Sequence, residues 1–306
     1  MNSRRINRFL KRLWLDRFIY LLLLPGVVFF IVFNYIPMYG ITLAFKKYMV
    51  ASGILGSPWV GTLNFDKLFK LPDFWRAVKN TVIISLQRLV FEFPVPLILA
   101  LLINEVRNSF AKRFLQTVFT FPNFLSWIVV TGITFNLMAD NGLINVLMVM
   151  FGGEKQALLS NTGFFRPLLY ITSNWKGAGW TAIIYLASIT SINHELYEAA
   201  VIDGATRFQQ TIYVTWPGIR ATVAIMLILA IGNTMNAGFD QIFNMYNATV
   251  YSVADILETY IYRRAFSTGS DFSAATAASL FRAVINFVLL LLANWGSRLI
   301  GEEGLF

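Results

Sequence analysis

The polar stretch HELYEAAVIDGA occupies residues 194–205 of a chain that is otherwise rich in long apolar segments. Its early residues are mostly good helix formers, which predicts a short helix over residues 194–202. Gly204 follows at the position where a residue with positive φ commonly ends a helix. A second helical piece is expected after Arg207, and Pro217 marks the approach to the next apolar segment. The stretch therefore predicts a short helix–turn–helix that presents acidic side chains and a face of small residues.

The composition indicates an integral membrane protein. Of the 306 residues, 57 % are hydrophobic and 13 % are charged, whereas soluble domains are about 45–50 % apolar and about 25 % charged. The mean hydropathy of +0.60 points the same way. A soluble globule of this size needs a charged shell that these residues cannot supply. The absence of Cys excludes disulfides, thiolate nucleophiles and sulfur-ligated metals, and a single histidine, His194, leaves no pair for a zinc site.

Six apolar segments are long enough to span a bilayer, which requires about 20 mainly apolar residues. The first follows a basic tail of residues 1–17 and is too long for the apolar region of a signal peptide, so we expect a retained helix, bent at Pro25 and ending near Pro37. The predicted spans are residues 18–45, 77–104, 114–139, 165–191, 220–240 and 274–298. Residues 143–151 are apolar but too short to span, which predicts an interfacial helix. The sequence thus predicts an all-α polytopic membrane protein with one transmembrane domain over residues 18–301 and a short tail, 302–306.

The net charge of +9 and its distribution predict how the chain lies in the membrane. No basic run is interleaved with aromatic residues in a polar segment, so anionic lipid headgroups, and not nucleic acid, are the expected partner of this charge. Six spans place both termini on one side. The segments on that side, with the basic tail foremost, carry more Lys and Arg than the opposite loops. The positive-inside rule therefore favours cytoplasmic termini.

The sequence contains no motif for catalysis or nucleotide binding. It has no G-x-x-x-x-G-K-[ST] run, no H-E-x-x-H and no G-x-S-x-G. Arg88 and Glu92 are four residues apart in the second predicted span, hence on one helix face. As a catalytic acid and base they would be a weak signal, and we interpret them as a structural ion pair that faces the bundle interior. No catalytic residue and no metal ligand is predicted.

The polar stretch could be an ordinary interfacial linker, but its spacing resembles the EAA loop of binding-protein-dependent ABC importer permeases. Glu198-Ala199-Ala200 is followed after three residues by Gly204 and then by Val214-x-Trp216-Pro217, where the family usually has Ile-x-Leu-Pro. Val214 and Trp216 are apolar like the residues they replace, so the apolar character of these two positions is kept. The resemblance implies that the loop of residues 192–219 carries a cytoplasmic coupling helix that docks on an ATPase. The implied coupling residues are Glu198, Ala199, Ala200, Asp203, Gly204, Ala205 and Pro217.

Further segments resemble the carbohydrate branch of these permeases, which includes lipoprotein-linked polysaccharide systems. They are YIPMYG (35–40) with AFK (44–46), GSPWVG (56–61), GFDQI (238–242) and ANW (293–295). The resemblance implies a type I, maltose-permease-like importer fold in the cell membrane of a bacterium. It also implies an ABC ATPase dimer, a second homologous permease, an extracytoplasmic solute-binding protein and a carbohydrate substrate. The ATPase would bind ATP and Mg, so the resemblance implies no cofactor for this chain. The sequence does not exclude a homodimeric permease, in which the second subunit is another copy of this chain.

A candidate sugar path follows from polar residues at the depth of the predicted spans. Lipid-facing positions are normally apolar, so such residues usually face protein or a cavity. In the fifth span three of them share one helix face, at i, i+3 and i+7, and in the fourth span three are consecutive. These candidates are Asn233, Asn236 and Asp240, and Asn174, Trp175 and Lys176. Amides between helices, or an Asp240–Lys176 ion pair, would explain them equally well as packing residues.

Two other functions compete with the importer. An ion-coupled secondary transporter is expected to show titratable groups at the midplane and often inverted repeats. A membrane-embedded glycosyl or phosphoryl transferase is expected to show clustered acids near one interface. The sequence shows neither a repeat nor such a cluster, and both alternatives leave the EAA-like spacing unexplained.

Overall fold

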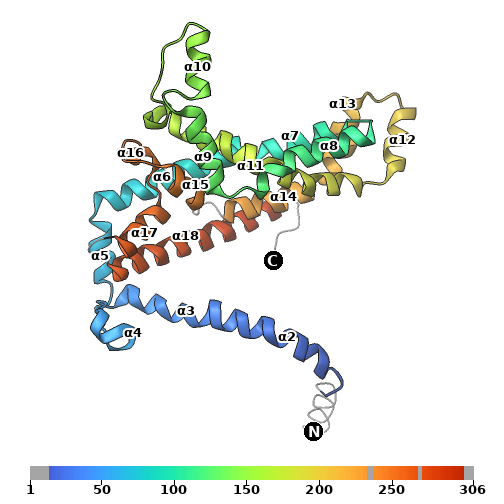
Figure 1. Cartoon of the computed structure of the whole chain (residues 1–306). Helices are drawn as coiled ribbons and strands as arrows, with labels where there is room; N and C mark the ends of the chain where they lie inside the picture. The colour runs from blue at the N-terminus through green and yellow to red at the C-terminus, as the bar shows by residue number, and fades with distance from the viewer. Residues whose placement is uncertain (1–13, 233–236, 268–270, 300–306) are drawn as a thin grey trace. The chain divides into compact units, whose positions relative to one another are not determined.

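The structure, a computed structural model, describes residues 14–232, 237–267 and 271–299. Within these ranges the chain is almost entirely helical (Figure 1). Lys46 and Trp59 form an isolated β-bridge. The predicted all-α fold is confirmed. The chain divides into two compact units, Met1–Leu68 with Asp271–Leu280, and Phe69–Ser270 with Phe281–Phe306.

The first predicted span is a continuous helical run from Arg17 to Phe45 in the first unit. It consists of α2 (Arg17–Phe30) with Pro25 inside, a π-helical turn (Ile31–Tyr35), α3 (Ile36–Met38) and a 3-10 helix (Tyr39–Phe45). The run therefore continues beyond Pro37, because proline is tolerated in the first turn of α3. Its most apolar window is not buried in the unit at all, which suits a helix whose neighbours are lipid.

The segments AFK and GSPWVG have a structural role in the first unit. The Asn64 side chain in α5 (Leu63–Phe69) donates to the carbonyl oxygens of Ala44 and Lys46, at 2.8 and 2.9 Å. The Phe45 and Trp59 rings stack with their centroids 5.6 Å apart. Between these contacts lie a 3-10 turn (Val50–Ser52) and α4 (Gly53–Gly56). These contacts fix the chain that follows the first span.

The second predicted span is not one helix. It consists of α6 (Pro72–Phe91) and α7 (Pro94–Asn104), which are separated at Glu92 and Phe93. Pro94 accounts for the break, because a proline inside a helix lacks the N–H donor and its ring clashes with the carbonyl four residues earlier. As the first residue of α7, the same proline is favourable.

The third predicted span, residues 114–139, is also interrupted. Helix α8 (Ser109–Thr120) passes into a 3-10 turn (Phe121–Phe124), and α9 (Trp127–Met138) begins after Ser126. Pro122 lies in the turn, and the Ser126 hydroxyl accepts the Val129 N–H as the N-cap of the new helix. Pro122 and Ser126 indicate a helix end and a helix start, and the apolar composition of the segment led to both being missed. The predicted short helix is present as α10 (Leu143–Met150). However, the segment long and apolar enough to cross a membrane runs here from Trp127 to Met150, so it includes α10 and leaves out α8, which differs from the predicted bounds.

The fourth predicted span is the unbroken helix α11 (Thr162–Thr190), whose first turn is capped by the Asn161 side chain. Figure 1 shows α7, α8 and α14 (Trp216–Gly232) beside it. Among the described residues, five helical segments are long and apolar enough to cross a membrane, and α11, with Arg166 and Lys176, is not among them. The count of six spans therefore stays a prediction.

The fifth predicted span is divided before Asp240. The described part of α14 reaches Gly232, Ala237 and Gly238 both have positive φ, and Asp240 lies in a separate helix, α15 (Phe239–Met245). Gly238 begins α15 at φ 78°, in the left-handed region that favours glycine. The idea that Asp240 shares one helix face with Asn233 and Asn236 is therefore wrong, while Asn233 and Asn236 themselves lie outside the described residues. The helices that follow α15 are α16 (Tyr251–Ala254), α17 (Leu257–Phe266) and α18 (Phe272–Leu299).

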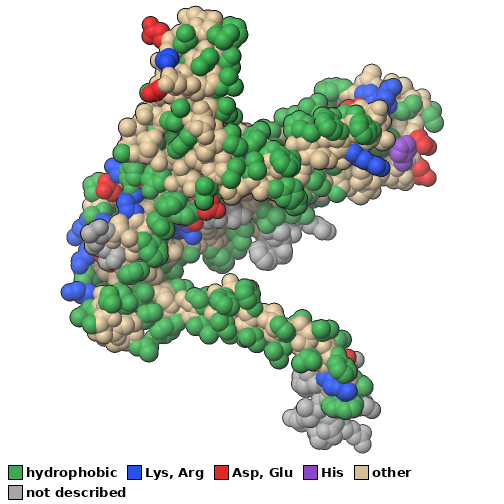
Figure 2. Space-filling model, in the orientation of Figure 1, with side chains coloured by type: hydrophobic (Ala, Val, Ile, Leu, Met, Phe, Trp, Pro, Cys, Tyr) green, Lys and Arg blue, Asp and Glu red, His purple; other side chains and the backbone are tan. Residues whose placement is uncertain are grey.

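The core of the second unit packs around α11. Ile84, Leu169, Ile242 and Ile256 are fully buried in one cluster, and a second cluster includes Tyr185. In Figure 2 charged side chains gather at the end formed by α12 (His194–Ile202) and α13 (Arg207–Gln210). The helices that lead to this end are covered mainly by hydrophobic side chains.

Gly179 sets the close approach of α11 to α8. A Cβ atom at this position would lie 2.0 Å from the Phe119 carbonyl oxygen, whereas one at Gly177, on the same helix, would meet nothing within 4 Å. We expect Gly179→Ala to destabilise the protein by about 1–3 kcal/mol, the usual effect of overpacking. Gly177→Ala is the matched control. Thermal denaturation in detergent measures the difference, and equal melting temperatures for the two variants would contradict the assigned packing.

Candidate functional site

The polar loop folds as its sequence predicts. Helix α12 spans His194–Ile202, and its first turn is capped by the Asn193 side chain, which accepts the Glu195 N–H at 3.1 Å. Gly204 has φ 78°. The Ala205 N–H donates to the Ala200 carbonyl at 2.8 Å and the Gly204 N–H to the Val201 carbonyl at 3.0 Å, the bonding pattern of a Schellman motif. The predicted helix and the positive φ of Gly204 are confirmed.

The loop is joined firmly to the helix that follows it. The Thr206 side chain caps α13, and the Gln209 side chain bonds back to the Thr206 N–H at 2.7 Å. The Tyr197 and Thr215 hydroxyls hydrogen-bond at 2.9 Å and connect α12 to the π-helical turn (Thr211–Thr215) directly before α14. Helix α12 is therefore connected to α14 by this hydrogen bond as well as by the short helical segment between them.

The outer face of α12 combines a charge with an apolar tip. Glu198 is 3.2 Å from His194 Nδ1, and both side chains are largely exposed. Ala199, Asp203 and Gly204 are exposed beside it, and Pro217 is exposed in the first turn of α14. Ile202, at the tip, is 86 % exposed. Ile202 was not among the predicted coupling residues; with its neighbour Val201, which is 59 % exposed, it forms a small exposed apolar group at the end of α12.

A polar cluster lies at the break between α6 and α7, and we define it as Arg88, Glu92, Ser173 and Gln241. Glu92 Oε2 accepts from Arg88 Nη1 at 3.1 Å and from the Ser173 hydroxyl at 2.9 Å. Arg88 Nη2 donates to Gln241 Oε1. The predicted Arg88–Glu92 ion pair is therefore confirmed, and its side chains are only 17 % and 18 % exposed. Ser173 and Gln241 come from α11 and α15, so no local pattern could have identified them.

Side chains of α11 also satisfy the backbone at both broken spans. Asn174 Nδ2 donates to the Phe91 carbonyl at 3.0 Å, at the end of α6. Lys176 Nζ donates to the Asn123 carbonyl at 2.7 Å, in the turn between α8 and α9. The alternative in which Lys176 and Asp240 form an ion pair is therefore wrong. Trp175, between them, is 48 % exposed.

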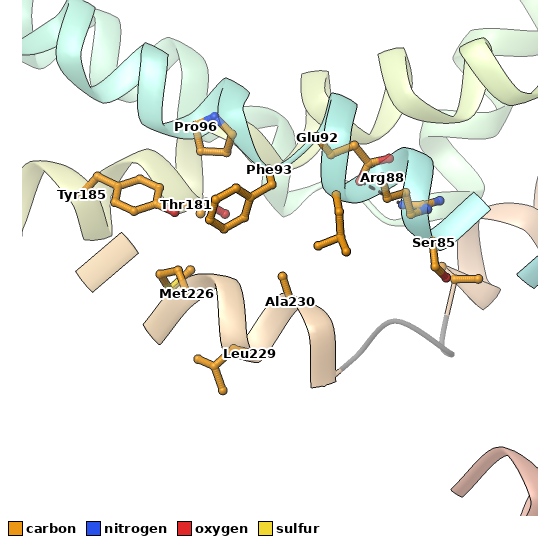
Figure 3. A pocket seen from close by; sticks show the side chains of 13 residues that line it. Ser85, Arg88, Glu92, Phe93, Pro96, Thr181, Tyr185, Met226, Leu229 and Ala230 are labelled. Carbon is orange, nitrogen blue, oxygen red and sulfur yellow. Dashed lines mark hydrogen bonds and ion pairs between the residues drawn. The ribbon is translucent and has the colours of Figure 1, made fainter. Parts of the chain in front are cut away.

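A cavity of about 430 Å³ opens beside the polar cluster (Figure 3). Arg88 and Glu92 line one end of it, and Thr181 and Tyr185 of α11 line the other. Side chains of α14 form the wall opposite α7, with Met226 labelled there in the figure. The cavity thus joins a charged end to a mainly apolar wall. Gly238 is next to the cluster, where a Cβ atom would lie 2.6 Å from Arg88 Nη2.

Comparison with known proteins identifies the class. The fold is that of a type I ABC importer permease: a chain of a crystallised bacterial ABC transporter that imports the acidic polysaccharide alginate superimposes with a TM-score of 0.89, at 38 % identity over 96 % of this chain and 99 % of that one. A second alginate transporter structure, in complex with a periplasmic protein that holds an alginate pentasaccharide, gives a TM-score of 0.90 at 37 % identity over 97 % of this chain and 100 % of that one.

The family follows from the sequence match. Residues 92–301 match the model of the binding-protein-dependent transport system inner membrane component, and the chain belongs to this family. The polygalacturonan/rhamnogalacturonan transport system permease protein YteP of Bacillus subtilis is 44 % identical over 98 % of this chain and 94 % of its own length. Protein LplB of the same organism is 43 % identical over 95 % and 92 %. The chain is therefore a multi-pass membrane transport subunit and not an enzyme.

The buried ion pair generates a test of the polar cluster. Removing one partner of a buried pair leaves the other charge uncompensated, which costs about 3–5 kcal/mol. Since the pair keeps some exposure, we expect Glu92→Ala to destabilise the protein by about 3 kcal/mol. The double variant Arg88→Met/Glu92→Leu removes both charges and should regain most of the loss. Thermal denaturation of the detergent-solubilised protein measures both, and a Glu92→Ala variant as stable as the parent would contradict the cluster.

Proposed function

We propose that the chain is the membrane-spanning subunit of an ATP-driven importer for an oligosaccharide or a polysaccharide fragment. The observation that carries the proposal is the likeness over 96 % of the chain to a subunit of an alginate importer. The relative YteP, described as a polygalacturonan/rhamnogalacturonan permease, supports the same substrate class. The net charge of +9 suits a protein seated among anionic headgroups of a bacterial cell membrane.

The proposed assembly contains three further kinds of component and places both termini in the cytoplasm. In this orientation α12 faces an ABC ATPase dimer, which binds ATP and Mg in place of this chain. A second homologous permease completes the path. An extracytoplasmic solute-binding protein delivers the sugar, and the alginate transporter in complex with its loaded periplasmic protein supports this partner.

The proposed mechanism is alternating access, driven from the coupling loop. The residues that carry it are Glu198, Ala199, Ala200, Asp203, Gly204, Ala205 and Pro217, with Ile202 as an apolar anchor. Exposed Glu198 meets charge on the ATPase, and exposed Ile202 fits an apolar site there. When ATP closes the ATPase dimer, α12 moves, and the Tyr197–Thr215 hydrogen bond transmits the movement to α14, which lines the cavity.

The proposed sugar path includes the cavity and the polar residues near it. Amides and carboxylates suit sugar hydroxyls, and aromatic faces suit their C–H surfaces. Asn174 and Lys176 donate hydrogen bonds to backbone carbonyls at the two helix breaks. In the proposed path they therefore have two roles: they line it, and they hold the broken helices apart. Trp175 and Asp240 are exposed. The proposed path residues are Asn174, Trp175, Lys176, Asn233, Asn236 and Asp240.

The coupling loop provides the test of this function. Gly204→Val adds a branched side chain at positive φ, where even a Cβ atom costs about 1 kcal/mol or more. Glu198→Lys reverses the charge of the docking face. We expect each variant to assemble with its partners and to lose substrate-stimulated ATP hydrolysis by about tenfold, equivalent to about 1.4 kcal/mol of coupling.

The matched control is Gly152→Val, which imposes the same backbone strain (φ 82°) in an exposed turn after α10. It should lower stability without uncoupling ATP hydrolysis from substrate. Normal stimulated hydrolysis in both loop variants would remove the loop from the mechanism. Purified yield and assembly of the complex separate uncoupling from misfolding.

A further inference from the structure

Helices α15 and α17 present four aromatic rings in a connected row. The ring centroids of Phe239 and Phe243 are 5.2 Å apart, those of Phe243 and Tyr262 are 4.8 Å apart, and those of Tyr262 and Phe266 are 5.1 Å apart. We call these four residues the aromatic row. Its inner end packs on the core through Phe239. Its outer end is exposed: Tyr262 is 42 % and Phe266 is 69 % exposed.

Lipid does not account for this exposure. Helix α17 is not among the described segments that are long and apolar enough to cross a membrane. It carries Glu258, Arg263 and Arg264 in ten residues. Large aromatic side chains left exposed on a polar helix indicate a contact with something other than acyl chains.

Two charges beside the aromatic row have no ion-pair partner among the described residues: Arg264, whose Nε donates to the Tyr260 hydroxyl at 3.2 Å, and Asp240. Arg263 is held by both oxygens of buried Asp255, at 3.1 and 3.0 Å, so its charge is neutralised internally. Asp240 follows Phe239 directly and is exposed, and it forms no ion pair with any described residue. Asn244, one turn later, is half-buried, and its Nδ2 donates to the Asp240 backbone carbonyl at 2.7 Å.

This combination fits one class of ligand. A carbohydrate ring has apolar C–H faces, which pack on aromatic rings, and peripheral hydroxyls, which donate to carboxylate and amide oxygens. Several rings in sequence fit several linked sugar units better than one monosaccharide.

We propose that the aromatic row and Asp240 form a binding surface for the linked sugar rings of the substrate. Tyr262 and Phe266 receive the C–H faces, and Asp240 accepts hydroxyl hydrogen bonds at the inner end. The inference rests on the proposed carbohydrate import and deepens it, because it names where the sugar chain contacts the permease. In the proposed orientation, α15 and α17 follow the fifth span on the extracytoplasmic side, where the sugar arrives.

The test uses the full complex of both permeases, ATPase and binding protein in proteoliposomes. Uptake of oligogalacturonate and alginate fragments of increasing length is measured for the parent and for Tyr262→Ala/Phe266→Ala. We expect the KM of the double variant to rise about tenfold for long fragments and little for disaccharides. Tyr262→Phe keeps the ring and should behave as the parent. Asp240→Asn should raise the KM for fragments of all lengths.

Phe110→Ala is the control, because Phe110 is 78 % exposed on α8, outside the aromatic row. It should leave the dependence on fragment length unchanged. Equal KM values for the double variant and the parent at every length would overturn the inference. Loss of assembly with the second permease in the double variant would also overturn it and would make the aromatic row a subunit interface. Absence of sugar uptake by the parent complex would instead overturn the proposed function.

Discussion

A helix that breaks inside a bilayer leaves backbone carbonyls that only other protein groups can satisfy, because no water is present to bond them. Two of the predicted spans break, and one unbroken helix, α11, serves both. Asn174 bonds the carbonyl at the end of α6, and Lys176 bonds the carbonyl in the turn between α8 and α9. Ser173 adds a bond to Glu92 at the first break. Three residues within one turn of α11 thus hold the bends around which the second unit is packed.

The same helix leads directly into the proposed coupling loop. Helix α11 ends at Thr190, and α12 begins at His194, so an ATPase that moves α12 acts on the chain that also anchors the two bends. The second connection runs through Tyr197 and Thr215 to α14. The cavity between α6, α11 and α14 lies where these connections meet (Figure 3). In the proposed mechanism, one displacement at the ATPase surface therefore changes two walls of the cavity together.

The sequence predicted those structural features that are determined by residues close together in the chain. The helix over residues 194–202 and the positive φ of Gly204 are set by neighbouring residues, and both are confirmed. The Arg88–Glu92 pair follows from helix spacing alone. Pro94 indicates the break in the second span, and Gly238 indicates the start of α15. Neither break was predicted, because both residues lie in long apolar segments that satisfy the criterion for a continuous span. Gln241 lies in the GFDQI segment that resembles the family, but its contact with Arg88 depends on tertiary packing, and no sequence pattern indicates that contact.

The function assigned to this architecture has two parts, carbohydrate import and an energy source outside the chain. Both are tested by uptake of a labelled oligogalacturonate or alginate fragment into proteoliposomes that contain the chain, its partner permease and the binding protein. Uptake is compared with and without a separately purified ATPase, and with either ATP and Mg or an ion gradient. The account predicts accumulation only when the ATPase and ATP are both present. Accumulation driven by a proton or sodium gradient in the absence of ATP would contradict it.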